Sequence, residues 1–190
     1  MGIEATLKVY ELSNEAGNEA VQLSNELNLG STTGNLADAY RHFAWNAKMT
    51  RSPDIGYYGA KNITNRYEYE EMQDRNWLLQ SSGEFDPYQD NTIISGRMNQ
   101  PMLMDLWNNQ VGRELANNSN YKNMNIRQLF NMAYEKGWLI TDENKVYEFL
   151  GISEYKSNDA DYAVNVSWNL STGVIKVGDG RKSVSLWIGI

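Results

Sequence analysis

The chain contains a single histidine, His42, with a polar side chain one helical turn to either side of it. Asp38 precedes the histidine by one turn and Asn46 follows it by one turn, so a helix would place all three side chains in one stripe. An imidazole beside a carboxylate suits general base catalysis, and it also suits metal binding. The helix that carries this stripe is predicted to begin after Asn35, a favourable N-cap, and to end before Ser52-Pro53.

Two other predicted helices carry polar side chains beside an apolar face. The helix that follows Ser52-Pro53 has Glu68 at the edge of its apolar side. A later helix opens near Asn99, and four polar residues flank its apolar face: Asp105, Asn108, Asn109 and Arg113. A buried polar group without a partner costs about 1–3 kcal/mol. We therefore expect the three sets of side chains to meet inside the fold.

Such a cluster supports two chemistries. In the first, His42 is a general base oriented by Asp38 or Asp105, while Arg113 stabilises developing negative charge. In the second, His42, Glu68 and Asp105 bind a divalent metal ion that activates water. The residues assigned to catalysis are His42, Asp38, Asp105, Arg113 and Glu68, and those assigned to substrate binding are Asn46, Asn108 and Asn109.

A non-catalytic interpretation stands beside these two. The same side chains can form a buried hydrogen-bond network that fixes the register of the helices in a binding or structural module. No HExxH, GxSxG, P-loop or GxGxxG motif is present that would favour the catalytic over the non-catalytic interpretation. A hydrolase and a non-enzymatic module are therefore both kept as alternatives.

Three motifs in these segments resemble an uncharacterised bacterial domain family found at the C-terminal ends of Rhs-type and other polymorphic toxin-like proteins. They are DAYRHFAWNAKMTR, the segment from Gly59 to Glu68, and MDLWNNQVGRE. By position, the family's motif residues fall on Asp38, His42, Asn46, Glu68, Asp105, Asn108, Asn109, Gly112 and Arg113. Where the family often has His before its Glu, this chain has Tyr67, which removes a second imidazole and weakens the metal interpretation.

The resemblance implies a delivered effector, with a cognate immunity protein or a carrier polypeptide as partner and a leaderless secretion route. It does not name a reaction. The sequence has no signal-peptide pattern and no apolar run long enough for a membrane span, so a soluble protein is expected. The compartment stays open, because a chain without cysteine tolerates export.

The formal net charge of -7 and the lack of a basic cluster argue against a nucleic-acid partner. Among hydrolases this acidity disfavours a nuclease. Tyr and Trp are plentiful, with 12 and 6 residues; such side chains chiefly fill protein cores, and they also suit contacts to sugars or polar lipids. A lipid, lipid-linked or glycan substrate is therefore preferred.

Hydrophobic periodicity predicts a mainly α-helical protein with a small antiparallel β-meander at its C-terminus. Residues 1–150 form the predicted helical domain and residues 151–190 the meander. Gly17 is the expected kink in the first helix, and 80–92 is an expected loop. The central helix is expected to bury Leu36, Phe43, Trp45 and Ala47. Predicted helices cover 3–29, 35–51, 52–74, 99–117, 126–136 and 141–150, and predicted strands cover 163–168, 174–177 and 183–188.

Overall fold

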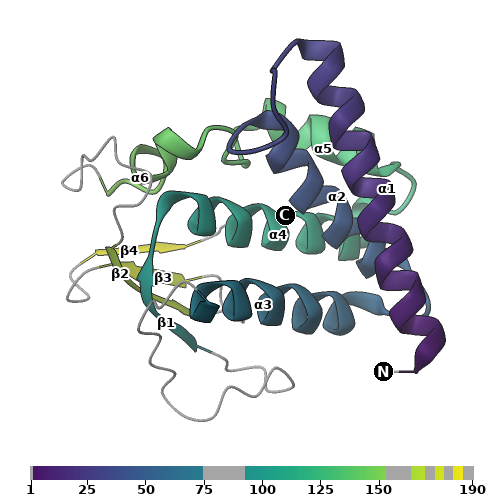
Figure 1. The fold of residues 1–190 in the computed structure, drawn as a ribbon, viewed down its shortest axis with the longest axis horizontal. Coiled ribbons are helices and arrows are strands. Elements are labelled where there is room, and N and C mark those ends of the chain that lie inside the picture. Colours follow the sequence, from purple (N-terminus) through teal and green to yellow (C-terminus); the bar gives the residue numbers. More distant parts are fainter. Residues whose placement is uncertain (1, 75–92, 153–163, 170–173, 178–181, 186–190) are drawn as a thin grey trace.

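The protein is mainly helical, with a small antiparallel sheet at one side (Figure 1). The structure is a computed structural model that describes residues 2–74, 93–152, 164–169, 174–177 and 182–185. Its helices are α1 (Ile3–Leu27), α2 (Leu36–Arg51), α3 (Gly56–Asp74), α4 (Gln100–Asn117), α5 (Ile126–Glu135) and α6 (Val146–Phe149), with short 3-10 turns η1 (Ser119–Tyr121) and η2 (Glu143–Lys145). Its strands are β1 (Ile93–Met98), β2 (Val164–Asn169), β3 (Val174–Val177) and β4 (Lys182–Ser185).

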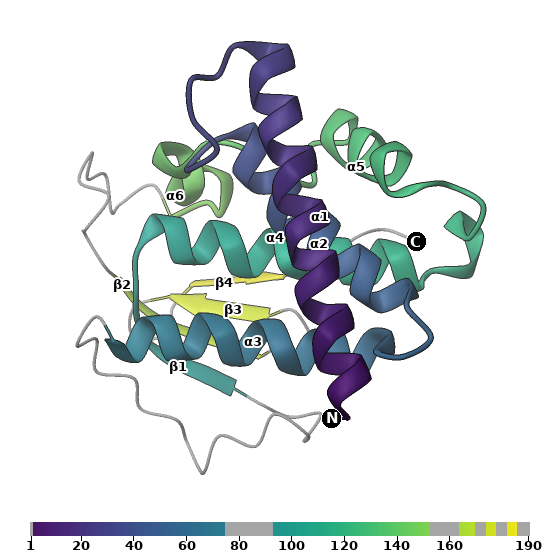
Figure 2. The same cartoon turned by 45° about the vertical axis from the view of Figure 1, so that its right-hand side comes forward.

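Helix α2 is the central element, and it packs against α1, α3, α4 and α5 (Figure 2). Its predicted start is confirmed, since the Asn35 side chain accepts hydrogen bonds from the backbone N–H groups of Ala37 and Asp38. Phe43 and Ala47 are fully buried as expected, whereas Leu36 and Trp45 are only partly buried. The helix is therefore enclosed on most of its surface, which makes it a rigid carrier for the His42 stripe.

Helix α1 crosses α2 and covers one of its faces. The expected kink at Gly17 does not occur, because α1 continues through that residue as a single helix. Its inner face buries Leu12, Ala16, Ala20 and Leu23. No helix among the described residues has both the length and the hydrophobicity that a bilayer crossing requires.

Helix α3 begins later than predicted. Ser52 is not an N-cap with a following helical proline; residues 52–55 instead form a turn in which the Gly56 N–H donates to the Ser52 carbonyl at 2.9 Å. Gly56 has φ +68°, a left-handed conformation that glycine adopts without strain. This turn reverses the chain, so that α3 returns along α2 (Figure 1).

The predicted C-terminal meander is present, and it belongs to a four-stranded sheet in the order β1-β2-β3-β4 with every pair antiparallel. The sequence did not predict β1, which precedes α4 and pairs with β2. Trp168 of β2 is fully buried, and its Nε1 donates to Gln110 Oε1 on α4 at 3.2 Å. The sheet thus covers α4. The predicted loop 80–92 and the predicted strand residues Ala163 and 186–188 lie outside the described residues.

Helices α2 and α4 approach each other closely at Gly112. A Cβ atom at this position would lie 2.4 Å from the carbonyl oxygen of Phe43, which is shorter than any ordinary contact. Only glycine permits this separation of the two helix backbones. The close approach allows short side chains on α2 to bond directly to side chains on α4.

Candidate functional site: three polar layers between three helices

Helices α2 and α4 each contribute a stripe of side chains at i, i+4 and i+8, and α3 contributes two side chains at i and i+4. The stripes meet in three layers. The first layer holds Asp38, Asp105 and Nε2 of His42; the second holds the His42 ring, Asn109 and Glu68; the third holds Asn46, Thr64 and Arg113. Side chains of α2 and α4 pair in the same order along both helices, so these helices run in the same direction, while α3 runs in the opposite one.

The third layer is closed to solvent and sets the direction of the hydrogen bonds in the second layer. Nη1 of Arg113 donates to Asn46 Oδ1 at 2.7 Å and to Thr64 Oγ1 at 2.9 Å. Burial lowers the pKa of Arg113 to about 10, even though the nearby Tyr57, Glu114 and Glu68 act in the opposite direction. The guanidinium is therefore charged at pH 7 and acts only as a donor.

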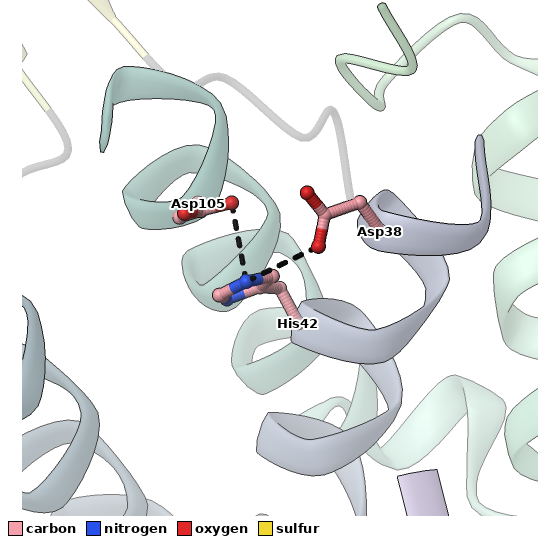
Figure 3. A group of neighbouring side chains, drawn as sticks. All are labelled: Asp38, His42 and Asp105. Atoms are coloured by element: carbon pink, nitrogen blue, oxygen red, sulfur yellow. Dashed lines mark ion pairs between the residues drawn. The ribbon is translucent and has the colours of Figure 1, made fainter. Parts of the chain in front are cut away.

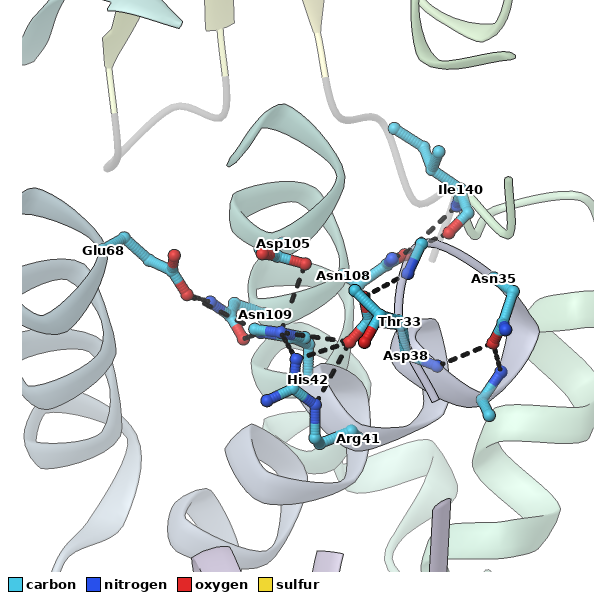
Figure 4. A network of polar contacts seen from close by, with 12 residues as sticks. Thr33, Asn35, Asp38, Arg41, His42, Glu68, Asp105, Asn108, Asn109 and Ile140 are labelled. Atoms are coloured by element: carbon cyan, nitrogen blue, oxygen red, sulfur yellow. Dashed lines mark hydrogen bonds and ion pairs between the residues drawn. The ribbon is translucent and has the colours of Figure 1, made fainter. Parts of the chain in front are cut away.

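The second layer fixes the tautomer of His42 (Figure 4). Because Asn46 turns its oxygen toward Arg113, its Nδ2 donates to Asn109 Oδ1, at 2.5 Å. Asn109 then turns its Nδ2 toward Glu68 Oε1, at 2.9 Å. Nδ1 of His42 lies 3.2 Å from Asn109 Oδ1 and 3.6 Å from Glu68 Oε1, both acceptors. Nδ1 must therefore carry the proton, and the neutral ring has its lone pair on Nε2.

The first layer surrounds that lone pair with carboxylates (Figure 3). Nε2 of His42 lies 3.2 Å from Asp105 Oδ1 and 3.6 Å from Asp38 Oδ1. Nη2 of Arg41 lies 3.0 Å from Nε2 and donates to Asp38 Oδ1 at 2.5 Å. The side chain of Arg41 is 44% exposed and that of Asp105 is 19% exposed, so this layer is the one that solvent can approach.

The environment keeps His42 neutral. Burial and the charge of Arg41 lower the pKa of His42 to about 4, although Asp38 and the hydrogen bond to Asn109 oppose the shift. A neutral imidazole can accept a proton or bind a metal ion through its lone pair once Arg41 moves off Nε2. Both roles require Nε2, which is the nitrogen that faces the first layer.

The structure brings together seven of the eight predicted site residues. His42, Asp38 and Asp105 share the first layer. Glu68 lies beside Nδ1, on the side of the ring away from the Nε2 lone pair, so it cannot share an ion with that nitrogen. Arg113 joins His42 through Asn46 and Asn109 and serves to orient them.

Asn108 is the predicted site residue that the structure separates from the cluster. Its Nδ2 donates to the Ile140 carbonyl at 2.8 Å, and its Oδ1 accepts from the Ile140 N–H at 3.1 Å. The sequence analysis in turn missed Arg41 and Thr64 as members of the cluster. Thr64 stands one turn before Glu68, and this spacing was the available signal.

Replacing Asn108 by alanine is expected to lower the free energy of unfolding by about 2 kcal/mol, because two buried backbone groups of Ile140 would lose their partner. Chemical denaturation measures the change. Asn120→Ala, at an exposed position, is the matched control and should change stability by less than about 0.5 kcal/mol. An equally small change for Asn108→Ala would contradict the structural role.

A groove of about 560 Å³ lies apart from the cluster. It is lined by residues of α1, α2 and the start of α5, among them Glu19, Tyr40, Lys48 and Arg127. Tyr40 and Lys48 lie on the face of α2 roughly opposite His42. The groove therefore offers no direct access to the first layer.

Comparison with protein families gives one match. A family model described as Domain of unknown function (DUF6973) matches residues 2–137, a range that includes all three stripes. Neither the comparison with curated proteins nor the comparison with solved structures found a match. The chain therefore belongs to the DUF6973 family, an uncharacterised domain family.

Proposed function

We propose that the protein is a hydrolase in which the first layer activates a water molecule. One observation carries this proposal: a neutral His42, locked in a single tautomer, directs its Nε2 lone pair at two aspartates on the solvent-accessible side of an otherwise closed network. Nη2 of Arg41 lies 3.0 Å from Nε2 and donates to Asp38, so the lone pair and this aspartate share one cationic group. When Arg41 moves aside, these electron-rich groups are suited to hold a water molecule or a cation between them.

In the metal-free form of the reaction, water enters the first layer when Arg41 moves off Nε2. Nε2 takes a proton from this water, and the oxygen attacks the electrophilic centre of the substrate. The bond between that centre and the leaving group then breaks, and the imidazolium gives its proton to the leaving group, which restores neutral His42. Asp38 and Asp105 stabilise the imidazolium that forms. Asn109 keeps the ring in place, because its Oδ1 accepts a hydrogen bond from Nδ1–H both before and after Nε2 is protonated.

We further propose that the hydrolase acts as an effector delivered to other bacteria, as the resemblance to Rhs-type and polymorphic toxin-like proteins implies. The net charge of -7 supports a substrate other than nucleic acid, because a polyanion would be repelled. A lipid, lipid-linked or glycan substrate fits this charge. A cognate immunity protein or a carrier polypeptide would then be the natural partner.

Replacing His42 by glutamine is expected to abolish growth inhibition when the protein is produced in bacteria. The amide removes the basic nitrogen and retains a side chain of similar reach. Growth should be measured with and without export to the periplasm, beside thermal melts of each purified protein. Asp105→Asn provides a second variant that keeps the shape and removes the charge. Glu11→Gln, on the exposed face of α1, is the charge-matched control and should inhibit growth like the wild type.

The alternative is a non-catalytic module in which the three layers only hold the helices together. In that case the wild type would be harmless in both compartments, and His42→Gln would lower stability by about 1–3 kcal/mol through an unsatisfied buried partner. A growth effect that tracks the loss of folded protein across the variants would also reject the hydrolase.

A further inference from the structure

We propose that Asp38, His42 and Asp105 bind a divalent cation of the Mn²⁺ or Zn²⁺ type, and that the Arg41 side chain holds this position until the cation displaces it. The proposal deepens the function proposed above by naming the cofactor of the same site. It differs from the ligand set expected from sequence, because Asp38 takes the place of Glu68.

The geometry of the first layer suits a cation. The ligand atoms of the three residues lie within 4.8 Å of one another, and the two distances from Nε2 are 3.2 Å to Asp105 and 3.6 Å to Asp38. In a tetrahedral site, metal–ligand bonds of about 2.0–2.2 Å place adjacent ligand atoms about 3.3–3.6 Å apart. Small side-chain adjustments would therefore bring all three atoms onto one ion (Figure 3).

The groups that hydrogen-bond to the proposed ligands His42 and Asp38 are arranged like those around protein-bound metal ions. A metal-bound histidine normally donates its second ring N–H to an acceptor, and His42 donates Nδ1–H to Asn109 Oδ1. The free oxygen of a ligating carboxylate is normally hydrogen-bonded, and Asp38 Oδ2 accepts from the Gly34 N–H at 2.7 Å. These contacts hold two ligands in orientation independently of Arg41.

The charge of the first layer also favours a divalent ion. Asp38 and Asp105 bring two carboxylates to the Nε2 lone pair, and the guanidinium of Arg41 bonds to Asp38 and lies 3.0 Å from Nε2. A divalent ion would balance both aspartates at once. Arg41 can leave, because its side chain is half exposed on the surface of α2.

One nitrogen and two carboxylate ligands suit borderline and hard cations such as Zn²⁺ and Mn²⁺. Three protein ligands leave coordination positions for water or substrate, as in catalytic rather than structural sites. When bound, such an ion supplies a water molecule of lowered pKa. The chain's own contribution would be to orient the ligands through Asn109 and Gly34 and to release Arg41.

The test measures metal binding by the full chain without any substrate. Mn²⁺ is titrated into the protein and free ion is followed by electron paramagnetic resonance, while Zn²⁺ and Mg²⁺ are followed by calorimetry. We expect one Mn²⁺ or Zn²⁺ per chain in the wild type and at least roughly tenfold weaker binding in Asp105→Asn. Arg41→Gln should bind roughly tenfold more tightly, because its competitor is gone.

Lys8→Gln is the matched control for Arg41→Gln. Lys8 is an exposed cation paired with Glu11 at i,i+3, so this variant makes the same change in net charge away from the cluster. Its metal affinity should equal that of the wild type. An equal gain in Lys8→Gln would show that net charge alone attracts the ion, and would overturn the competition by Arg41.

Two outcomes separate this inference from the proposed hydrolase. If the wild type inhibits growth but binds neither Mn²⁺ nor Zn²⁺ at millimolar concentration, the cation site is rejected and the metal-free reaction stands. If one ion binds and Asp105→Asn loses it, but the wild type is harmless, the site stands and the hydrolase fails. Equal affinity in wild type and Asp105→Asn rejects the site.

Discussion

Replacing Phe43 by alanine is expected to lower the free energy of unfolding by about 3–5 kcal/mol. Phe43 is completely buried on α2, and its ring meets that of Phe130 on α5 edge to face, with centroids 5.5 Å apart. Its backbone contacts α4 at Gly112, so the surroundings cannot easily close the cavity that alanine would leave. Urea denaturation of the full chain measures the difference.

Phe149→Ala is the matched control for this truncation. Phe149 is 38% exposed and contacts Trp107, with centroids 5.3 Å apart. The same chemical change should cost less than about 1.5 kcal/mol there, because part of the ring already faces water. A loss below about 1 kcal/mol for Phe43→Ala would mean that this face of α2 is not core.

Replacing Gly112 by alanine should lower the free energy of unfolding by about 3 kcal/mol, at the upper end of the range for overpacking. The new Cβ would meet the Phe43 carbonyl, a backbone atom that cannot turn aside, so α2 and α4 must separate. Separation would lengthen the bonds that Asn109 makes to Asn46 and His42. Since His42 is the only histidine, the ¹⁵N signals of one imidazole report this directly by nuclear magnetic resonance.

Gly17→Ala is the same substitution at another position, and there we expect the free energy of unfolding to rise. Gly17 lies inside α1, and a Cβ atom there would meet nothing within 4 Å. Alanine should therefore stabilise the protein by about 0.5–1 kcal/mol, because it favours the helix more than glycine does. Equal effects of the two variants would show that the α2–α4 approach is not as close as described.

Local signals in the sequence predicted much of what positions the cluster. Asn35 caps α2, Asn99 caps α4, and the turn spacing of Asp38, His42 and Asn46 places them on one face. Helical periodicity also identified the sides of α3 and α4 that carry Glu68 and Asp105. These features depend on neighbours within one or two turns, so a single sequence contains them.

Features that depend on distant partners could not be predicted in this way. Arg41 has the spacing of a solvent-facing residue. It bonds to Asp38 of its own helix, but the part of its environment that comes from Asp105 is brought by α4 from far along the chain. Asn108 lies beside Asn109 on the same helix, but its side-chain amide bonds to the backbone of Ile140 and not to the cluster. Strand β1 is short and forms by pairing with β2, which is distant in sequence. Local periodicity therefore could not predict it.

The pairing of β1 with β2 has a consequence for the order of folding. Met98 pairs with Val164 and Ile93 with Asn169, so residues 99–163 must be spanned before the strands can meet. Closing such a long loop costs conformational entropy, but the contact between His42 and Asn109 spans a similar 67 residues. Since α4 ends at Asn117, well before β2, we expect α1 to α4 to assemble first during synthesis and the sheet to close last. Until Trp168 has been synthesised, Trp107 on α4 lacks its ring contact with Trp168, and Gln110 lacks the hydrogen bond from Trp168 Nε1.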